Sequence, residues 1–326
     1  MGKDGDVDAF RKCFNFFKSY RGESQSNYDI IDFDSPKFHH PNIEHCDVKS
    51  QFSQENFSNV GLRHPTTWKL LKLKGTSGFY FIVNPFLKWG SAFWVQKCLI
   101  HYTDSPNFTN LSGSSAGDQI WEKSVPLLTN KRFGQPKTLI EQLRWATLGY
   151  HYNWTTRKYY SDNCSPFPSE LQALSRIIAA SVGFHEYNAE AAIVNFYPLK
   201  STLGIHKDEV ELDAISPLIS FSFGKSAIFL LGSSSKSEEP MPLLVRPGDI
   251  LVMHGKSRHA YHALPVILAN NDASALNPND FEDLSEIEKE AIDNYIADHR
   301  INISVRQVFN TPSDIALLEK HDPRIL

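Results

Sequence analysis

The sequence predicts an α+β fold in which a sandwich or jelly-roll core carries flanking helices and an N-terminal extension. The first observation is a series of short β-type runs after residue 190, most of them bounded by Gly, Pro or Ser. The second is a set of amphipathic helical stripes before that point. Short strands with turn punctuation are typical of sandwiches and jelly rolls. The runs read AAIVNFY, PLISFSF, AIFLLG, PLLVRPG, DILVMHG and INISVRQVF.

Residues 1–65 are expected to form an N-terminal region that lies over the body of the protein. A helix over 8–20 carries four apolar side chains at helical spacing, and we expect it to dock through that face. Residues 21–65 are rich in Ser, Asn, Asp and His, which predicts an extended, partly ordered wrap. The docking side chains are Phe10, Cys13, Phe14 and Phe17.

Residues 66–188 are expected to hold supporting helices together with strand segments. The run GFYFIVNPFL over 78–87 predicts a strand, and 89–103 predicts a helix. Residues 104–130 are loop-like apart from one short helical piece. A second helix over 168–182 has an acidic first turn and a glycine after its end. The inward side chains expected of the first helix are Trp94, Cys98 and Leu99.

Residues 189–326 hold the β-rich core. Within it, 223–226 (FGKS) predicts a tight hairpin and 246–249 (RPGD) a second turn. An acidic insert over 270–299 interrupts the β pattern. Its segment 284–299 predicts a helix, which we interpret as a surface elaboration.

Composition limits the class of protein. The 326 residues are 41% hydrophobic, enough for a core in one large domain or two small ones. The net charge is -4, so binding to nucleic acid would need a local basic patch. Four scattered cysteines without a C-x-x-C pattern predict a reducing compartment. With neither a secretory signal nor a long apolar run, we expect an intracellular protein of the nucleus, cytoplasm or mitochondrion, without a membrane span.

Three residues form the pattern of a metal site. His206 and Asp208 are two apart, so on a strand their side chains point the same way. His262 follows from a later strand. Two histidines and one carboxylate on one face of a metal leave open positions, which an oxygen-activating ferrous site needs. A lone H-x-D is more often a surface pair, so this interpretation depends on its surroundings.

The last β run supplies Arg300, Asn302 and Arg306 at even spacing, which turns all three to one face. Inward arginines on an apolar strand are costly unless they are paired. A small dianion would satisfy both, because guanidinium groups match carboxylates. The alternative is that they make structural salt bridges with acidic neighbours. Asn195 and Tyr197 alternate on the strand before His206 and could bind the same ligand.

Residues 131–160 combine basic and aromatic side chains. Basic groups neutralise phosphates and aromatic rings stack on bases. The alternative is that the rings are ordinary core and the charges are solvated. The basic residues are Lys131, Arg132, Lys137, Arg157 and Lys158, and the aromatic ones Trp145, Tyr150, Tyr152 and Trp154.

Together these motifs resemble those of the AlkB-type Fe(II)/2-oxoglutarate dioxygenases. The segments LRWATLGYHYNW, STLGIHKDEVELD, PLISFSFGKSAIFLLG and NISVRQV are most similar to the AlkB homologue 1 branch. The resemblance is weak over 21–65 and 270–299. It implies a double-stranded β-helix, or jelly-roll, core over 189–326. It also implies a nucleotide-recognition region with supporting helices over 66–188.

The resemblance implies a role for each motif residue. The catalytic iron(II) would be held by His206, Asp208 and His262. The co-substrate 2-oxoglutarate would be held by Arg300 at its distal carboxylate, by Arg306 near its metal-side carboxylate, and by Asn195, Tyr197 and Asn302. Tyr150 stands where the family has an aromatic that packs on the substrate base. The full substrate-binding set is Trp145, Tyr150, Tyr152, Arg157 and Lys158.

The implied activity uses molecular oxygen to demethylate or hydroxylate methylated bases in nucleic acid. We expect tRNA, at N1-methyladenosine or 5-methylcytosine, before unpaired DNA at N6-methyladenine, because tRNA loops present unstacked bases. The alternatives are a histone or protein hydroxylase or demethylase, an abasic-site DNA lyase that uses Lys131 or Lys137, and a binding module without turnover. Intact iron ligands argue against the last. We expect a monomer.

Overall fold

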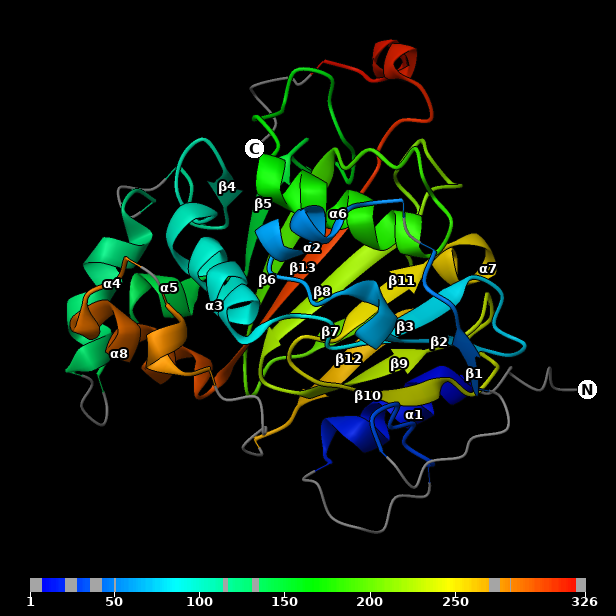
Figure 1. The fold of residues 1–326 in the computed structure, drawn as a ribbon, viewed down its shortest axis with the longest axis horizontal. Coiled ribbons are helices and arrows are strands. Elements are labelled where there is room, and N and C mark those ends of the chain that lie inside the picture. Colours follow the sequence, from blue (N-terminus) through cyan, green and yellow to red (C-terminus); the bar gives the residue numbers. More distant parts are fainter. Residues whose placement is uncertain are drawn as a thin grey trace, which may run out of the picture.

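The computed structural model describes residues 8–20, 28–35, 43–49, 51–113, 117–130, 135–269, 276–281 and 283–320. Two antiparallel sheets face each other, and helices pack on their outer faces (Figure 1). This is the jelly-roll core with flanking helices that the strand pattern predicts. Among the described residues, no helix is both long and apolar enough to cross a bilayer.

In the part of the chain that the structure describes, the large sheet has nine strands in the order β1-β2-β3-β11-β8-β13-β6-β5-β4. Strand β13 lies near its middle, paired along its length with β6 and β8. The strands are β1 (Ile43–Cys46), β2 (Lys69–Leu73), β3 (Phe79–Val83), β4 (Phe108–Thr109), β5 (Trp145–Gly149), β6 (Ala191–Pro198), β8 (Leu218–Gly224), β11 (Ile250–Met253) and β13 (His299–Arg306).

The small sheet has four strands in the order β10-β9-β12-β7. From β7 onward the chain crosses repeatedly between the two sheets, which is how a jelly roll is wound. The strands are β7 (Leu203–His206), β9 (Ala227–Leu231), β10 (Met241–Val245) and β12 (His262–Ile267).

The predicted hairpin over 223–226 is wrong. Strand β8 belongs to the large sheet and β9 to the small one, so this turn carries the chain across the sandwich instead of pairing neighbours. Gly224 has a φ of 73°, the left-handed conformation that glycine adopts without strain. A Cβ at this position would overlap the carbonyl oxygen of His299. A local turn pattern does not reveal which sheet the next strand joins.

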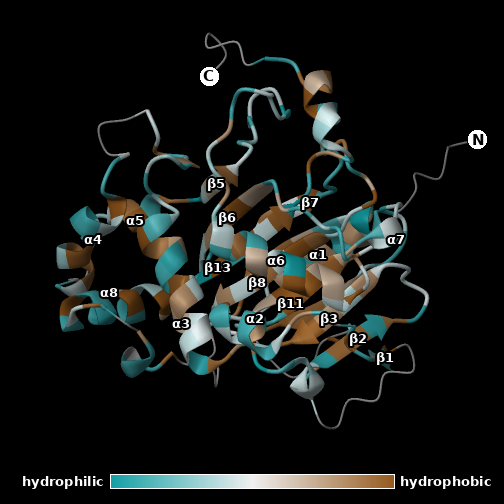
Figure 2. Ribbon diagram, turned by 45° about the horizontal axis from the view of Figure 1, so that its top comes forward, coloured by the Kyte–Doolittle hydropathy of each residue, from teal (hydrophilic) through white to brown (hydrophobic). Residues whose placement is uncertain are grey.

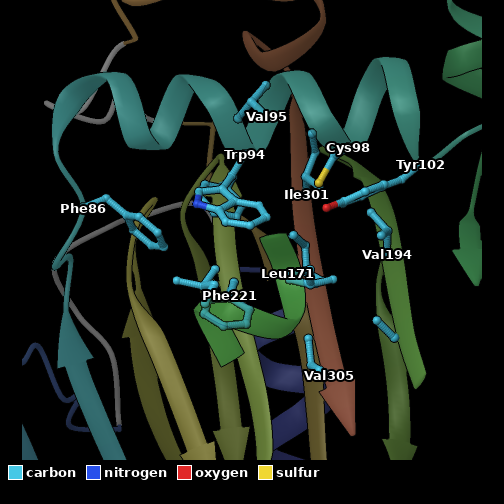
Figure 3. Close-up of a cluster of buried hydrophobic side chains, with 14 of the residues drawn as sticks. Phe86, Trp94, Val95, Cys98, Tyr102, Leu171, Val194, Phe221, Ile301 and Val305 are labelled. Atoms are coloured by element: carbon cyan, nitrogen blue, oxygen red, sulfur yellow. The ribbon is translucent and has the colours of Figure 1, made fainter. Parts of the chain in front are cut away.

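Helices cover the outer face of the large sheet (Figure 1). The predicted helix over 89–103 is present as α3, which continues into a π-helical turn, and the helix over 168–182 as α6. Trp94, Cys98 and Leu99 are fully buried, as their spacing predicts. Figure 3 shows Trp94 and Cys98 directed at side chains of the sheet, among them Ile301. The elements are α2 (Gln54–Asn59), α3 (Lys88–Gln96), the π-helical turn (Lys97–His101) and α6 (Ser169–Ser181).

A second group of helices gathers at one side of the large sheet (Figure 1). The helix predicted within the acidic insert is α8, but it is more than a surface elaboration. Ala291, Ile292 and Tyr295 are buried in the same core cluster as α3 and α4, so one face of α8 is part of the core. The acidic residues on the other faces of α8 dominate its composition, so the composition alone did not reveal the apolar stripe. The group consists of α4 (Ile120–Thr129), α5 (Leu139–Gln142) and α8 (Glu286–Ile296).

Helix α1 (Ala9–Lys18) covers the outer face of the small sheet, as its apolar stripe predicts. Phe10, Cys13 and Phe17 are fully buried there. Within 21–65, the described residues include one strand, β1, and one short helix, α2, which the sequence did not predict individually. Both elements are short, so periodicity over a long window missed them. The remaining short elements are Pro65–Thr67, α7 (Gly255–Arg258), Pro278–Asp280 and Pro312–Leu317.

In Figure 2 central strands such as β3 and β11 are mostly apolar, whereas the helices around them combine apolar and polar residues. The large sheet therefore buries one face under helices and turns the other toward the small sheet. Side chains of the second face are partly polar, and these form the site described below.

We predict that Gly224→Ala destabilises the protein more than Gly75→Ala. Gly75 also has a positive φ, but nothing lies within 4 Å of a Cβ built there, so its substitution reports backbone strain alone, about 1–2 kcal/mol. Gly224→Ala adds the overlap with the His299 carbonyl, about 1–3 kcal/mol more. Urea unfolding of both variants tests this, and equal losses would contradict the crossing-turn geometry.

Candidate functional site

A cavity of about 700 Å³ lies between the two sheets. Strands of both sheets contribute to its wall, and the loops after β5 and β7 form its mouth. From the large sheet come side chains of β6, β8, β11 and β13, and from the small sheet side chains of β7, β9, β10 and β12.

The structure brings His206, Asp208 and His262 together in this cavity, with donor atoms that all lie within 4.8 Å of one another. His206 is the last residue of β7 and His262 the first of β12, and the two pair across the small sheet. Asp208 lies beyond the end of β7. Its position therefore does not come from strand alternation, as the sequence argument assumed, but from contacts of the loop that carries it.

Both histidines are oriented through their Nδ1 atoms. His206 Nδ1 lies 2.9 Å from the carbonyl oxygen of Gly204, and His262 Nδ1 lies 3.1 Å from that of Ala260. A ring that donates its Nδ1–H to a carbonyl presents the lone pair of Nε2, which is the usual arrangement of a metal-binding histidine. His262 Nε2 lies 3.6 Å from Asp208 Oδ2.

The charge states of these groups suit a cation. Burial lowers the pKa of His262 to about 4, with the nearby His206 acting in the same direction, so the ring is neutral at physiological pH. Burial by itself raises the pKa of Asp208, but Arg306 and the two histidines outweigh it and hold that pKa well below its usual range. A neutral imidazole and an ionised carboxylate are the forms that bind metal.

Strand β13 turns Arg300, Asn302 and Arg306 into the cavity, as their even spacing predicts. Arg300 donates to the carbonyl of Lys225 at 3.0 Å and to the hydroxyl of Ser222 at 2.7 Å. These bonds fix the direction of a buried guanidinium.

Arg306 and Asn302 are fixed in other ways. Arg306 forms ion pairs with Asp208, Nη2 to Oδ1 at 3.3 Å, and with Glu211, Nε to Oε1 at 3.0 Å. The alternative that these arginines form salt bridges with acidic neighbours is thus correct for Arg306. Asn302 donates to the hydroxyl of Ser220 at 2.7 Å.

Asn195 and Tyr197 line the same cavity from β6. Across the sheet Asn195 is opposite Asn302 and Tyr197 is opposite Arg300. Burial raises the pKa of Tyr197, so its phenol stays protonated and can donate a hydrogen bond. Strand pairing thus brings a phenol beside Arg300 and an amide beside Asn302.

Comparison with known proteins identifies the family. The sequence profile of the 2OG-Fe(II) oxygenase superfamily matches residues 104–306. The chain belongs to this superfamily. Within it, the chain is an AlkB-type dioxygenase of the ALKBH1 branch, because its similarity to ALKBH1 proteins extends over 95% of its length.

Three relatives illustrate this similarity. Nucleic acid dioxygenase ALKBH1 of Mus musculus is 39% identical, over 95% of this chain and 86% of its own length. The DNA N(6)-methyladenine demethylase ALKBH1A of Arabidopsis thaliana is 31% identical, over 95% of this chain and 98% of its own. The tRNA demethylase abh1 of Schizosaccharomyces pombe is 41% identical, over 63% and 70% respectively.

Enzymes of the 2OG-Fe(II) oxygenase superfamily use Fe(II) and 2-oxoglutarate, and the cavity fits both. Two imidazoles and a carboxylate converge within 4.8 Å, and the Nδ1 contacts leave Nε2 of each ring available. Buried guanidinium groups beside them provide positive charge for a keto diacid. When bound, the iron and 2-oxoglutarate supply dioxygen activation coupled to conversion of the diacid into succinate and carbon dioxide.

The predicted substrate residues divide into two groups. Tyr152 and Arg157 line the cavity. The other three are not among its lining residues. The Trp145 ring lies 5.3 Å from that of Trp154, the Tyr150 ring lies 4.9 Å from that of Phe309, and Lys158 pairs with Glu319 at 3.1 Å.

Sequence reasoning missed several residues of this dioxygenase site. Ser220 and Ser222 orient Asn302 and Arg300, and their alternate spacing on β8 could have suggested an inward polar pair. Glu211 and Arg258 are fully buried and paired with each other at 2.7 Å. They are 47 residues apart, so no local pattern connects them.

We predict that Asp208→Ala lowers Fe(II)-dependent formation of succinate from 2-oxoglutarate by more than about 100-fold. It would remove one of the three predicted metal ligands, whereas changes to residues behind a ligand already cost about 10–100-fold. Glu286→Ala is the control, because Glu286 is 86% exposed on α8. Succinate yield with each purified variant measures the effect, and turnover by Asp208→Ala near the wild-type rate would remove this carboxylate from the metal site.

Proposed function

We propose that this dioxygenase oxidatively demethylates or hydroxylates methylated bases in nucleic acid, with tRNA as the main substrate. His206, Asp208 and His262 would hold the iron, and Arg300, Arg306, Asn195, Tyr197 and Asn302 would hold 2-oxoglutarate. The observation that carries the proposal is a cavity that joins this constellation to a rim of aromatic rings and one arginine.

The aromatic rim suits a nucleobase. Tyr159 is buried beside the cavity, Tyr152 contacts it with ring centroids 5.6 Å apart, and Trp154 contacts Tyr152 at 4.8 Å. All three line the cavity, and Trp154 is 45% exposed. Rings that run from surface to interior offer stacking partners for a base that enters from outside.

Arg157 adds a positive charge at the same rim. A tight turn presents it: Asn153 accepts from the backbone N–H of Arg157 at 2.8 Å, and Arg157 has a φ of 57°. A guanidinium presented from this turn at the edge of the cavity can contact a phosphate next to the bound base. Lys158, the following residue, is engaged with Glu319 instead.

The cavity volume of about 700 Å³ is within the usual range for small-molecule sites, about 300–1,000 Å³. A single base fits such a space and a duplex does not, so the target must be flipped or unpaired. Loops of tRNA offer unpaired bases without a melting cost, which favours tRNA over duplex DNA. Relatives of this chain include a tRNA demethylase and a DNA N(6)-methyladenine demethylase, which is consistent with both classes of substrate.

The proposal is tested by mass spectrometry of modified nucleosides. Total tRNA and denatured DNA are incubated with Fe(II), 2-oxoglutarate and either the wild-type protein or Asp208→Ala. We expect N1-methyladenosine or 5-methylcytosine in tRNA to fall, or its oxidised products to rise, only with wild type. If only N6-methyladenine in DNA changes, the substrate is DNA and not tRNA. If neither nucleic acid changes, the proposal is contradicted.

The lyase and histone alternatives gain no specific support from the described residues. Lys137 is exposed and does not line the cavity, and Lys131 lies outside the described residues. Abasic-site cleavage that persists in Asp208→Ala would nevertheless indicate a lysine nucleophile that acts without iron.

We predict that Arg157→Glu weakens tRNA binding by about 10-fold at low salt and that Lys158→Glu does not. Only Arg157 faces the cavity, so its reversal removes one phosphate contact and lowers the salt slope by about 1. Lys158→Glu is the matched control, with the same charge change one residue away. Filter binding at several salt concentrations distinguishes the two variants. If both weaken tRNA binding equally, Arg157 makes no specific phosphate contact and the two residues contribute only general positive charge.

A further inference from the structure

Arg258 is a buried cation that the reaction does not use directly. It ends the short helix α7, four residues before His262, and only 3% of its side chain is exposed. It is not among the lining residues of the cavity. A buried guanidinium is costly to desolvate, so its contacts must compensate for that cost.

Those contacts reach the loop that carries Asp208. Arg258 Nη1 donates to the main-chain carbonyl of Asp208 at 2.7 Å, and Nη2 donates to Glu211 Oε2 at 2.7 Å. The other oxygen of Glu211 pairs with Arg306 Nε at 3.0 Å, and Arg306 Nη2 returns to Asp208 Oδ1 at 3.3 Å. Two cations and two anions therefore form a closed ring, here called the charge ring.

The charge ring fixes the position of Asp208, which strand pairing does not fix. His206 and His262 are positioned by strand pairing, whereas Asp208 lies past the end of β7. Arg258 joins the segment that leads into His262 to the segment that contains Asp208. A fork with two donors fixes both distance and direction between them, which a single ammonium cannot do.

We propose that Arg258 is a positioning residue that sets the location of the Asp208 carboxylate relative to His262 for metal binding. This inference rests on one part of the proposed function, the metal site, and it does not depend on which substrate the enzyme uses. Arg258 acts through Asp208 and Glu211 and touches neither the metal nor the substrate.

The experiment is titration of the apo protein with Co²⁺ alone, followed by its visible absorption bands, which report ligand geometry. We expect Arg258→Lys to weaken Co²⁺ binding by about 10–100-fold and to change the band shape. Arg246→Lys is the matched control, because Arg246 forms a comparable two-point ion pair with Asp32, at 2.5 and 2.7 Å, and neither residue lines the cavity. That control should bind Co²⁺ as wild type does.

The outcomes separate this inference from the metal site itself. If the wild-type protein binds no Co²⁺, or binds it no more tightly than Asp208→Ala does, the metal site itself is rejected. Specific binding to wild type with unchanged affinity and bands in Arg258→Lys rejects the positioning role alone. Should Arg258→Lys not fold, Glu211→Gln takes its place, since it leaves Arg258 anchored mainly at the Asp208 carbonyl. Several-fold weaker binding is then expected, and unchanged binding overturns the proposal.

Discussion

The whole site depends on compensation of charge inside a sandwich of two sheets. Asp208, Glu211, Arg258 and Arg306 are mostly or fully buried, and each contacts at least one group of opposite charge or a carbonyl. Removal of one member would leave another charge uncompensated in a poorly solvated place. The same balance keeps Asp208 ionised, since burial alone would favour its protonated form. Ligand chemistry and stability are therefore linked through the same four side chains.

The winding of the jelly roll makes this compensation possible. Strands β7 and β12 pair directly at His206 and His262, while β13 faces them from the other sheet with its arginines. Turns such as the one at Gly224 send the chain from one sheet to the other, so residues far apart in sequence meet inside. Helices on the outer face of the large sheet bury its apolar side chains, while its inner face carries the polar groups of the cavity.

Much of the site could be predicted from the sequence, because its residues are spaced two or four apart along strands and therefore point to the same face. Arg300, Asn302 and Arg306 face one way, as even spacing requires, and Asn195 and Tyr197 oppose them in register. The apolar stripes of α1, α3 and α6 were equally plain. The hairpin at 223–226 and the surface role of the acidic insert were wrong, because partners of a turn or of a helix face are not encoded locally.

The sequence by itself determined the inward face of β13, the apolar faces of the main helices and the residue types of the metal centre, since periodicity and side-chain chemistry are local properties. Tertiary structure alone decided the rest. It set the position of Asp208 beyond its strand, the engagement of Lys158 by Glu319, and the pairing of Arg258 with Glu211. These depend on which distant segments the fold brings within hydrogen-bond range, and the pattern within any single segment does not contain that information.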